Sequence, residues 1–168
     1  MANQVEIERK YVIKMPGKSI LSEQDGYTVS KIIQIYLSSE EGVTHRVRMR
    51  SFGDRAVYTE TKKTRIDFIS SHEEENEITE AEFCELSRKI KSGTRPVIKT
   101  RHTFVFDGVT FEIDVYPEWQ HTAIMETELK SREERVKMPL FIEIVKDVTG
   151  DKNYSNASMA YAFPEELI

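Results

Sequence analysis

Charged residues recur at every second position in several segments of this chain, and this alternation limits the folds available to it. Residues 5–11 place Glu6, Glu8 and Lys10 at alternate positions, with mostly apolar residues between them. Side chains of a β-strand alternate between its two faces, so this segment predicts a strand with one charged and one apolar face. One such strand is common on the surface of a half-buried sheet. Its repetition along the chain is the informative observation.

The alternating pattern and the turn residues between segments predict roughly eight strands. We expect them at residues 5–11, 27–38, 44–50, 56–63, 72–78, 97–104, 109–116 and 123–129. The segment 72–78 has an alternative interpretation as a solvated run of charge. Asp107-Gly108 is the strongest hairpin signal in the chain. A capping box that begins at Thr79 predicts a helix over about residues 79–91, with Cys84 in or near the core. A second capping box predicts a short helix at 131–134, and residues 148–160 are expected to form a loop that enters a last helix.

Composition limits the class of protein. With 168 residues, of which 39% are hydrophobic and 32% charged, the chain is expected to form one soluble α+β domain spanning residues 1–168. The net charge of −5 gives no support to a nucleic-acid partner. No apolar run approaches the roughly 18 residues of a membrane helix, and residues 1–10 are too charged for a signal peptide. The single cysteine, Cys84, fits a reducing compartment, so we expect a cytoplasmic protein without a membrane partner.

The charged strand faces together carry both signs of charge. The basic positions are Lys10, Arg46, Arg48, Arg50, Lys62, Lys99 and Arg101. The acidic positions are Glu6, Glu8, Glu75, Glu77, Glu112, Asp114, Glu126 and Glu128. On an ordinary antiparallel sheet these residues would only solvate an outer surface. If the sheet instead curls so that its charged face lines the interior, both signs of charge surround one aqueous cavity.

A cavity of that kind contains the chemical groups that phosphoryl transfer requires. Clustered carboxylates without paired histidine or cysteine favour hard cations such as Mg²⁺ or Mn²⁺. Clustered arginine and lysine favour oxyanions, arginine through its planar fork and lysine as a point charge. A compact polyanion such as triphosphate could then be held by the basic residues while metal ions join it to the acidic ones. Trp119, beside Pro117, is interpreted as a packing anchor.

The charged pairs, taken in order, resemble the CYTH superfamily, also called triphosphate tunnel metalloenzymes, and in particular its short bacterial inorganic triphosphatases. The resemblance rests on Glu6-x-Glu8-x-Lys10, Gln34-x-Tyr36-Leu37, Arg48-x-Arg50, Lys62, Glu75-x-Glu77, Lys99-x-Arg101, Glu112-x-Asp114, Glu126-x-Glu128, Val148-Thr149 and Tyr154-Ser155-Asn156. It implies a closed eight-stranded antiparallel β-barrel, open as a tunnel, with helices packed outside. It also implies hydrolysis of inorganic triphosphate inside the tunnel, with Mg²⁺ or Mn²⁺ as cofactor.

The resemblance also assigns roles to individual residues. The implied metal ligands are Glu6, Glu8, Glu126 and Glu128. The implied phosphate-binding residues are Lys10, Arg48, Arg50, Lys62, Lys99 and Arg101. The implied catalytic residues are Glu75, Glu77, Glu112 and Asp114. These last four would complete metal binding or orient the attacking water, and which of them is the general base stays open.

The chain departs from the family pattern at several positions. Ile35 stands where glycine usually follows the glutamine of the second strand. Glu73 stands where an arginine often precedes the Glu75 pair, which removes one expected phosphate contact. Arg46, an additional base on the face of Arg48 and Arg50, would either compensate for that loss or reach solvent at the tunnel mouth.

These departures leave alternative functions open. Other members of the superfamily are class IV-type adenylate cyclases or thiamine triphosphatases with the same tunnel. If this chain were a thiamine triphosphatase, Trp119 could stack on thiamine. A third alternative is a sensor that binds polyphosphate or nucleotide without turnover. The preferred metal and the oligomeric state, a homodimer included, stay open. So do the register of residues 73–77 and the question of whether the C-terminal helix plugs the tunnel.

Overall fold

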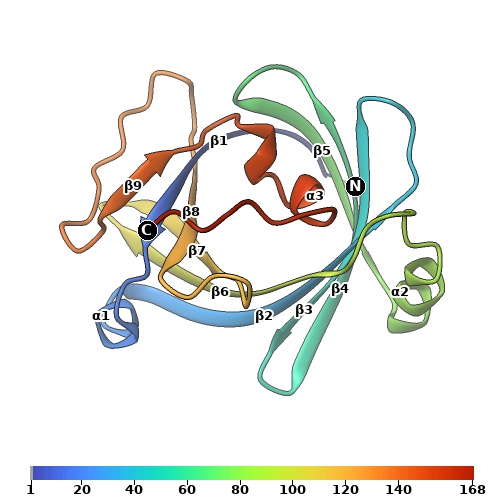
Figure 1. Cartoon of the computed structure of the whole chain (residues 1–168), viewed down its shortest axis with the longest axis horizontal. Helices are drawn as coiled ribbons and strands as arrows, with labels where there is room; N and C mark the ends of the chain where they lie inside the picture. The colour runs from blue at the N-terminus through green and yellow to red at the C-terminus, as the bar shows by residue number, and fades with distance from the viewer. Residues whose placement is uncertain (1) are drawn as a thin grey trace.

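Eight antiparallel strands close into a barrel in the computed structural model, which describes residues 2–168 (Figure 1). The strands are β1 (Ala2–Lys14), β2 (Asp25–Leu37), β3 (Val43–Phe52), β4 (Arg55–Arg65), β5 (Ser70–Ile78), β6 (Val97–Phe106), β7 (Val109–Val115) and β8 (Thr122–Glu128). Their spatial order is β5-β4-β3-β2-β6-β7-β8-β1, and pairing of β1 with β5 completes the ring. The predicted eight-stranded antiparallel barrel is therefore confirmed.

The long first strand closes the barrel. Residues 2–7 of β1 pair with β5, and residues 8–14 pair with β8 on the opposite edge. A short ninth strand, β9 (Ile144–Asp147), pairs with β1 at residues 11–13, where β5 no longer lies alongside it. The predicted hairpin between β6 and β7 is also confirmed, since Asp107 and Gly108 both adopt positive φ, as a tight two-residue turn requires.

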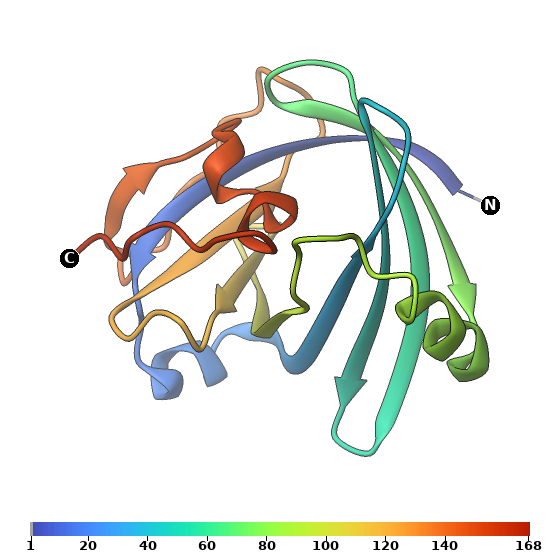
Figure 2. The same cartoon turned by 45° about the vertical axis from the view of Figure 1, so that its right-hand side comes forward.

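The outer face of the barrel carries the apolar residues of the alternating strands. Phe104, Phe111 and Met125 belong to an outer cluster that is covered by the short helix α1 (Lys18–Ser22) and by residues 136–142. Ile35 and Val47 belong to a second cluster, against which α2 (Glu80–Ser87) packs. Figures 1 and 2 show both helices outside the ring of strands. Burial of this outer face leaves the charged face inside the barrel.

The C-terminal segment closes one end of the barrel. It contains a single 3₁₀ turn, η1 (Lys152–Tyr154), and the short helix α3 (Asn156–Met159). Tyr154 and Met159 pack there with Tyr36, Val97 and Trp119 in an apolar cluster (Figure 2). The question left open by the sequence therefore has an answer: the last helix enters one end of the tunnel.

Trp119 lies within this end cluster. Its side chain is buried, and its indole N–H donates to the carbonyl oxygen of Pro164 at 3.1 Å. The interpretation of Trp119 as a packing anchor is confirmed. Its use as a platform for thiamine is excluded in this arrangement, because its ring faces Tyr116, Tyr154 and Phe163 and not a cavity.

Three expectations about the helical segments are wrong. The capping box of Thr79 and Glu82 is present, but α2 ends at Ser87, and Cys84 is exposed because Phe83 and Leu86 supply the packing face. Residues 131–134 form a turn, in which the Glu134 side chain binds the backbone N–H of Lys130. None of the helices in residues 2–168 is long and apolar enough to cross a membrane.

Candidate functional site

The inward-facing charged side chains surround a cavity of about 910 Å³ inside the barrel. This volume lies in the range of small-molecule sites. All of the predicted site residues line the cavity except Lys62, Glu77 and Asp114. The structure therefore places most of the predicted charged residues on the cavity wall, as the alternation predicted. The roles of the individual residues stay predictions.

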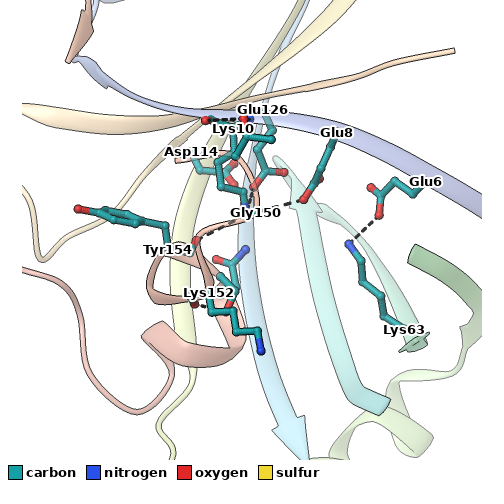
Figure 3. A network of polar contacts seen from close by, with 12 residues as sticks. Glu6, Glu8, Lys10, Lys63, Asp114, Glu126, Gly150, Lys152 and Tyr154 are labelled. Atoms are coloured by element: carbon teal, nitrogen blue, oxygen red, sulfur yellow. Dashed lines mark hydrogen bonds and ion pairs between the residues drawn. The ribbon is translucent and has the colours of Figure 1, made fainter. Parts of the chain in front are cut away.

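The acidic wall of the cavity is built by β1 and β8. These strands pair in register, with Lys10 opposite Glu126 and Glu8 opposite Glu128. Lys10 Nζ lies 3.2 Å from Glu126 Oε1 and 3.9 Å from Glu8 Oε1. Figure 3 shows these three side chains gathered at one wall. The backbone of Lys10 is held by Val148 and Thr149, whose N–H and hydroxyl groups contact it. The Val-Thr motif thus fixes the strand that carries three of the site residues.

Burial and like charge make the acidic wall unfavourable for further negative charge. Burial and the neighbouring Glu126 raise the pKa of Glu8. Burial and Glu6 likewise raise the pKa of Glu128. Burial opposes ionisation of Glu126 too, but Lys10, Arg101 and Lys99 together outweigh it and lower the pKa of Glu126 to about 2. A cation placed beside Glu8 would relieve this repulsion.

Lys63, and not Lys62, is the lysine of β4 that faces the cavity. Its Nζ lies 2.6 Å from Glu6 Oε2 (Figure 3). Lys62 is exposed and lies on the outer face with Glu60, which contacts His45. The expectation that Lys62 lines the tunnel is therefore wrong by one residue. The physical reason is that Tyr58, of the same parity as Lys62, packs outward against Phe83 of α2.

The basic wall of the cavity is built by β3, with three arginines on its inner face. Arg46 Nη2 lies 3.7 Å from Glu73 Oε1, and Arg48 Nη2 lies 3.2 Å from Glu75 Oε1. Arg50 instead donates from Nε to Ser30 Oγ at 2.8 Å. Burial and the neighbouring Arg46 lower the pKa of Arg48 to about 10. Each of the three guanidinium groups keeps donors that a bound oxyanion could use.

A buried ion cluster joins β6 to β7. Asp114 is fully buried and accepts from Lys99 Nζ at 2.7 Å and from Arg101 Nε and Nη2 at 2.7 and 2.8 Å. Asp114 pairs with Arg101 in the strand register, which explains the two-point contact. Burial lowers the pKa of Lys99 to about 8 despite this carboxylate. Asp114 therefore holds two cavity-lining cations in place and does not itself reach the cavity.

The four predicted catalytic carboxylates occupy three different environments. Glu75 and Glu112 line the cavity, and burial raises the pKa of Glu112. Glu77 has the expected strand parity but lies exposed near the end of β5, opposite Thr59 of β4, so its expected place on the lumen is wrong. Asp114 is enclosed by Lys99 and Arg101, which outweigh burial and hold its pKa well below the usual range. A carboxylate in that state is a weak base.

Oxygen ligands for a hard cation are present on the acidic wall. Glu6, Glu8, Glu126 and Glu128 all line the cavity, and an all-carboxylate set suits Mg²⁺ or Mn²⁺. Within residues 2–168, no three acidic, histidine or cysteine side chains lie close enough together to hold a metal ion as they stand. Lys10 and Lys63 instead neutralise Glu126 and Glu6. The donor chemistry fits such a cation, and the carboxylates would have to approach one another to share it.

Several cavity residues were not identified from the sequence as parts of the site. Glu73 and Lys63 follow the strand alternation once the register is known. Asn156 comes from irregular chain: its Oδ1 accepts from Tyr116 Oη at 2.8 Å and from Lys99 Nζ at 3.5 Å. Lys152, at the edge of the cavity, also comes from this segment. For Asn156 the available signal was its place in the Tyr154-Ser155-Asn156 motif.

The adjacent lysines of β4, Lys62 and Lys63, provide a direct test of which face of this strand lines the cavity. We expect Lys63→Ala to weaken triphosphate binding by about tenfold, since it removes a cation from the cavity wall. Lys62→Ala makes the same change of charge on the outer face and is expected to leave binding within about twofold. Titration calorimetry with triphosphate would measure both. An effect of Lys62→Ala as large as that of Lys63→Ala would contradict the orientation of β4.

Comparisons with known proteins give relatives that span nearly the whole chain. A protein of Acetivibrio thermocellus named inorganic triphosphatase is 32% identical over an alignment of 161 residues, and the match covers 92% of this chain and 92% of that one. The crystal structure of an inorganic triphosphatase superposes with a TM-score of 0.60 at 25% identity, covering 95% of this chain and 96% of that one. A structure from Pyrococcus horikoshii, 24% identical over 76% of this chain and 80% of its own, has the same fold with a TM-score of 0.54. No family model matches the chain.

Proposed function

The chain belongs to the CYTH superfamily of triphosphate tunnel metalloenzymes, and we propose that it hydrolyses inorganic triphosphate to pyrophosphate and phosphate. The observation that carries this proposal is the cavity itself. One wall presents the arginines of β3, the opposite wall presents the carboxylates of β1 and β8, and the space between them is about 910 Å³. A compact polyanion with metal counter-ions fits that distribution of charge.

The basic residues would bind and orient the substrate. Arg48, Arg50 and Arg101 would contact phosphate oxygens through their planar forks, while Lys10 and Lys99 would act as point charges. Asp114 fixes Arg101 and Lys99 before substrate arrives. This pre-organisation favours the charge that spreads over the phosphoryl oxygens in the transition state.

The acidic residues would hold the cofactor. We assign Mg²⁺ or Mn²⁺ to Glu6, Glu8, Glu126 and Glu128, whose oxygens line one wall. When bound, such an ion neutralises charge on the phosphates and lowers the pKa of a coordinated water. Glu112 and Glu75, which line the cavity, would orient the attacking water, and the raised pKa of Glu112 suits a general base. A cytoplasmic location is part of this proposal, supported by the single cysteine.

Phosphate release tests the proposal directly. Inorganic triphosphate, ATP and thiamine triphosphate would be compared with Mg²⁺, with Mn²⁺ and with chelator. We expect metal-dependent release that is fastest for inorganic triphosphate. Thermal-shift binding of triphosphate without release from any substrate would contradict hydrolysis and favour the sensor. Formation of cyclic AMP from ATP, or fastest release from thiamine triphosphate, would favour the corresponding alternative enzyme.

A further inference from the structure

Two carboxylates of β5, Glu73 and Glu75, face the arginines of β3 across the cavity wall, and Glu73 is the more buried of the two. Glu73 of β5 faces Arg46 of β3, with Oε1 and Nη2 3.7 Å apart, and both side chains are largely buried. In the strand register Glu73 lies opposite Lys63, which itself binds Glu6 at 2.6 Å (Figure 3). Two acids and two bases thus form a quartet, Glu6, Lys63, Glu73 and Arg46, which is neutral when all four are ionised.

This quartet lies at one end of the arginine row on β3. Residues at alternate positions of a strand are about 7 Å apart, so Arg46, Arg48 and Arg50 extend along the cavity wall. Arg46 pairs in register with Tyr36, which belongs to the apolar cluster at the closed end of the barrel. Arg50 forms no ion pair with a carboxylate within residues 2–168, whereas Glu75 pairs with Arg48 and Glu73 pairs with Arg46. The row is therefore most strongly cationic at Arg50 and is compensated toward Arg46.

Arg46 also has an unused donor. Its Nε is buried and has no hydrogen-bond partner in the described part of the chain. A buried guanidinium N–H without a partner is costly, so an anion that reached this position would find a ready contact. The nearby carboxylate of Glu73 opposes that anion by like-charge repulsion.

We propose that Glu73 sets the length of polyphosphate that the cavity accepts, by compensating Arg46 and repelling any phosphate group beyond the third. This inference rests on the proposed function, since it concerns the same cavity and the same class of substrate. A triphosphate is held by the cations from Arg48 to Arg50 and by Lys99 and Arg101. A fourth phosphate group extends to Arg46, where it meets the negative charge of Glu73. Discrimination here arises from a repulsive group in addition to the attractive ones.

The experiment compares Glu73→Gln with the natural protein, using inorganic triphosphate and inorganic tetraphosphate as probes. Binding is measured by titration calorimetry in chelator at about pH 8.5, well above the ordinary glutamate pKa of about 4.3. Phosphate release is measured separately with Mg²⁺. We expect the affinity for tetraphosphate relative to triphosphate to rise about tenfold in Glu73→Gln. Adding Arg46→Gln to this variant is expected to remove the gain in tetraphosphate affinity. The reason is that the gain comes from the charge of Arg46, which Glu73 no longer compensates.

Glu74→Gln is the matched control. Glu74 is the next residue of β5, on the opposite strand face and opposite the exposed Lys62, and its replacement changes the net charge equally. An unchanged preference in Glu73→Gln, an equal gain in Glu74→Gln, or a gain that survives Arg46→Gln would each overturn the inference. If the natural protein releases no phosphate but the binding preference still shifts, the proposed hydrolysis fails and the inference on chain length stands.

Discussion

Replacing Asp114 by asparagine is expected to lower the free energy of unfolding by about 3–5 kcal/mol. Asp114 is fully buried and compensates both Lys99 and Arg101, which are themselves buried. Asparagine keeps the shape but removes the charge, and its amide N–H₂ would face donors of the lysine or the arginine. Lys99 would then lose its ion-pair partner in the barrel wall, and Arg101 would keep only Glu112 and Glu126. Chemical denaturation of the two proteins at neutral pH measures the difference.

The dependence on pH separates this charge effect from a packing defect. The pKa of Asp114 is depressed in the folded protein, so the stability that it contributes is present above the unfolded carboxyl pKa. That stability is lost as the pH falls toward the folded value. The difference between Asp114→Asn and the natural protein should therefore shrink on acidification below about pH 4. Asp54→Asn, in the exposed turn between β3 and β4, should change stability by less than about 0.5 kcal/mol. A constant difference at all pH values would contradict the electrostatic explanation.

The strands with a consistent contrast between their faces were predictable from the sequence. On β1 and β7 the residues between the charged positions are apolar, with Arg9 as the exception, so the two-residue period identifies the inner face directly. Asp114 was correctly assigned to the inner face for this reason. Alternation says nothing about depth within the wall, however, and Asp114 lies beneath the cations that line the cavity.

The wrong assignments of site residues fall mainly on strands whose two faces do not differ clearly in polarity. On β4 both faces are polar, since Thr59, Thr61 and Lys63 alternate with Glu60 and Lys62. The packing of Tyr58 against α2 decides the orientation, and this contact is not encoded within the strand. Glu77 fails for a different reason: its parity is right, but its position along the barrel axis depends on how far β5 is staggered against β4. The C-terminal contacts of Asn156 come from irregular chain without a period, so only the family resemblance pointed to them.

Replacing Glu8 by glutamine is expected to reduce triphosphate turnover by at least about 10²–10³-fold while leaving the fold intact. Glu8 lies 3.9 Å from Lys10 and opposite Glu128 in the strand register, on the wall to which we assign the metal. Glutamine keeps one neutral oxygen and loses the charge that a divalent cation requires. Phosphate release over a range of Mg²⁺ concentrations measures the loss, and higher Mg²⁺ should recover part of it if the defect lies in metal binding.

The same substitution is expected to raise the free energy of unfolding. The pKa of Glu8 is raised by burial and by Glu126, so its ionisation at neutral pH costs folding free energy, and a neutral side chain removes that cost. The gain should be absent below the unfolded glutamate pKa of about 4.3, where Glu8 is protonated in both states, and should grow as the pH rises. Glu41→Gln, in the exposed turn between β2 and β3, should change neither turnover nor stability appreciably. A Glu8→Gln protein that is both less stable and less active would indicate that Glu8 supports the barrel. A variant that is more stable and inactive would identify a residue whose unfavourable charge is retained for the reaction.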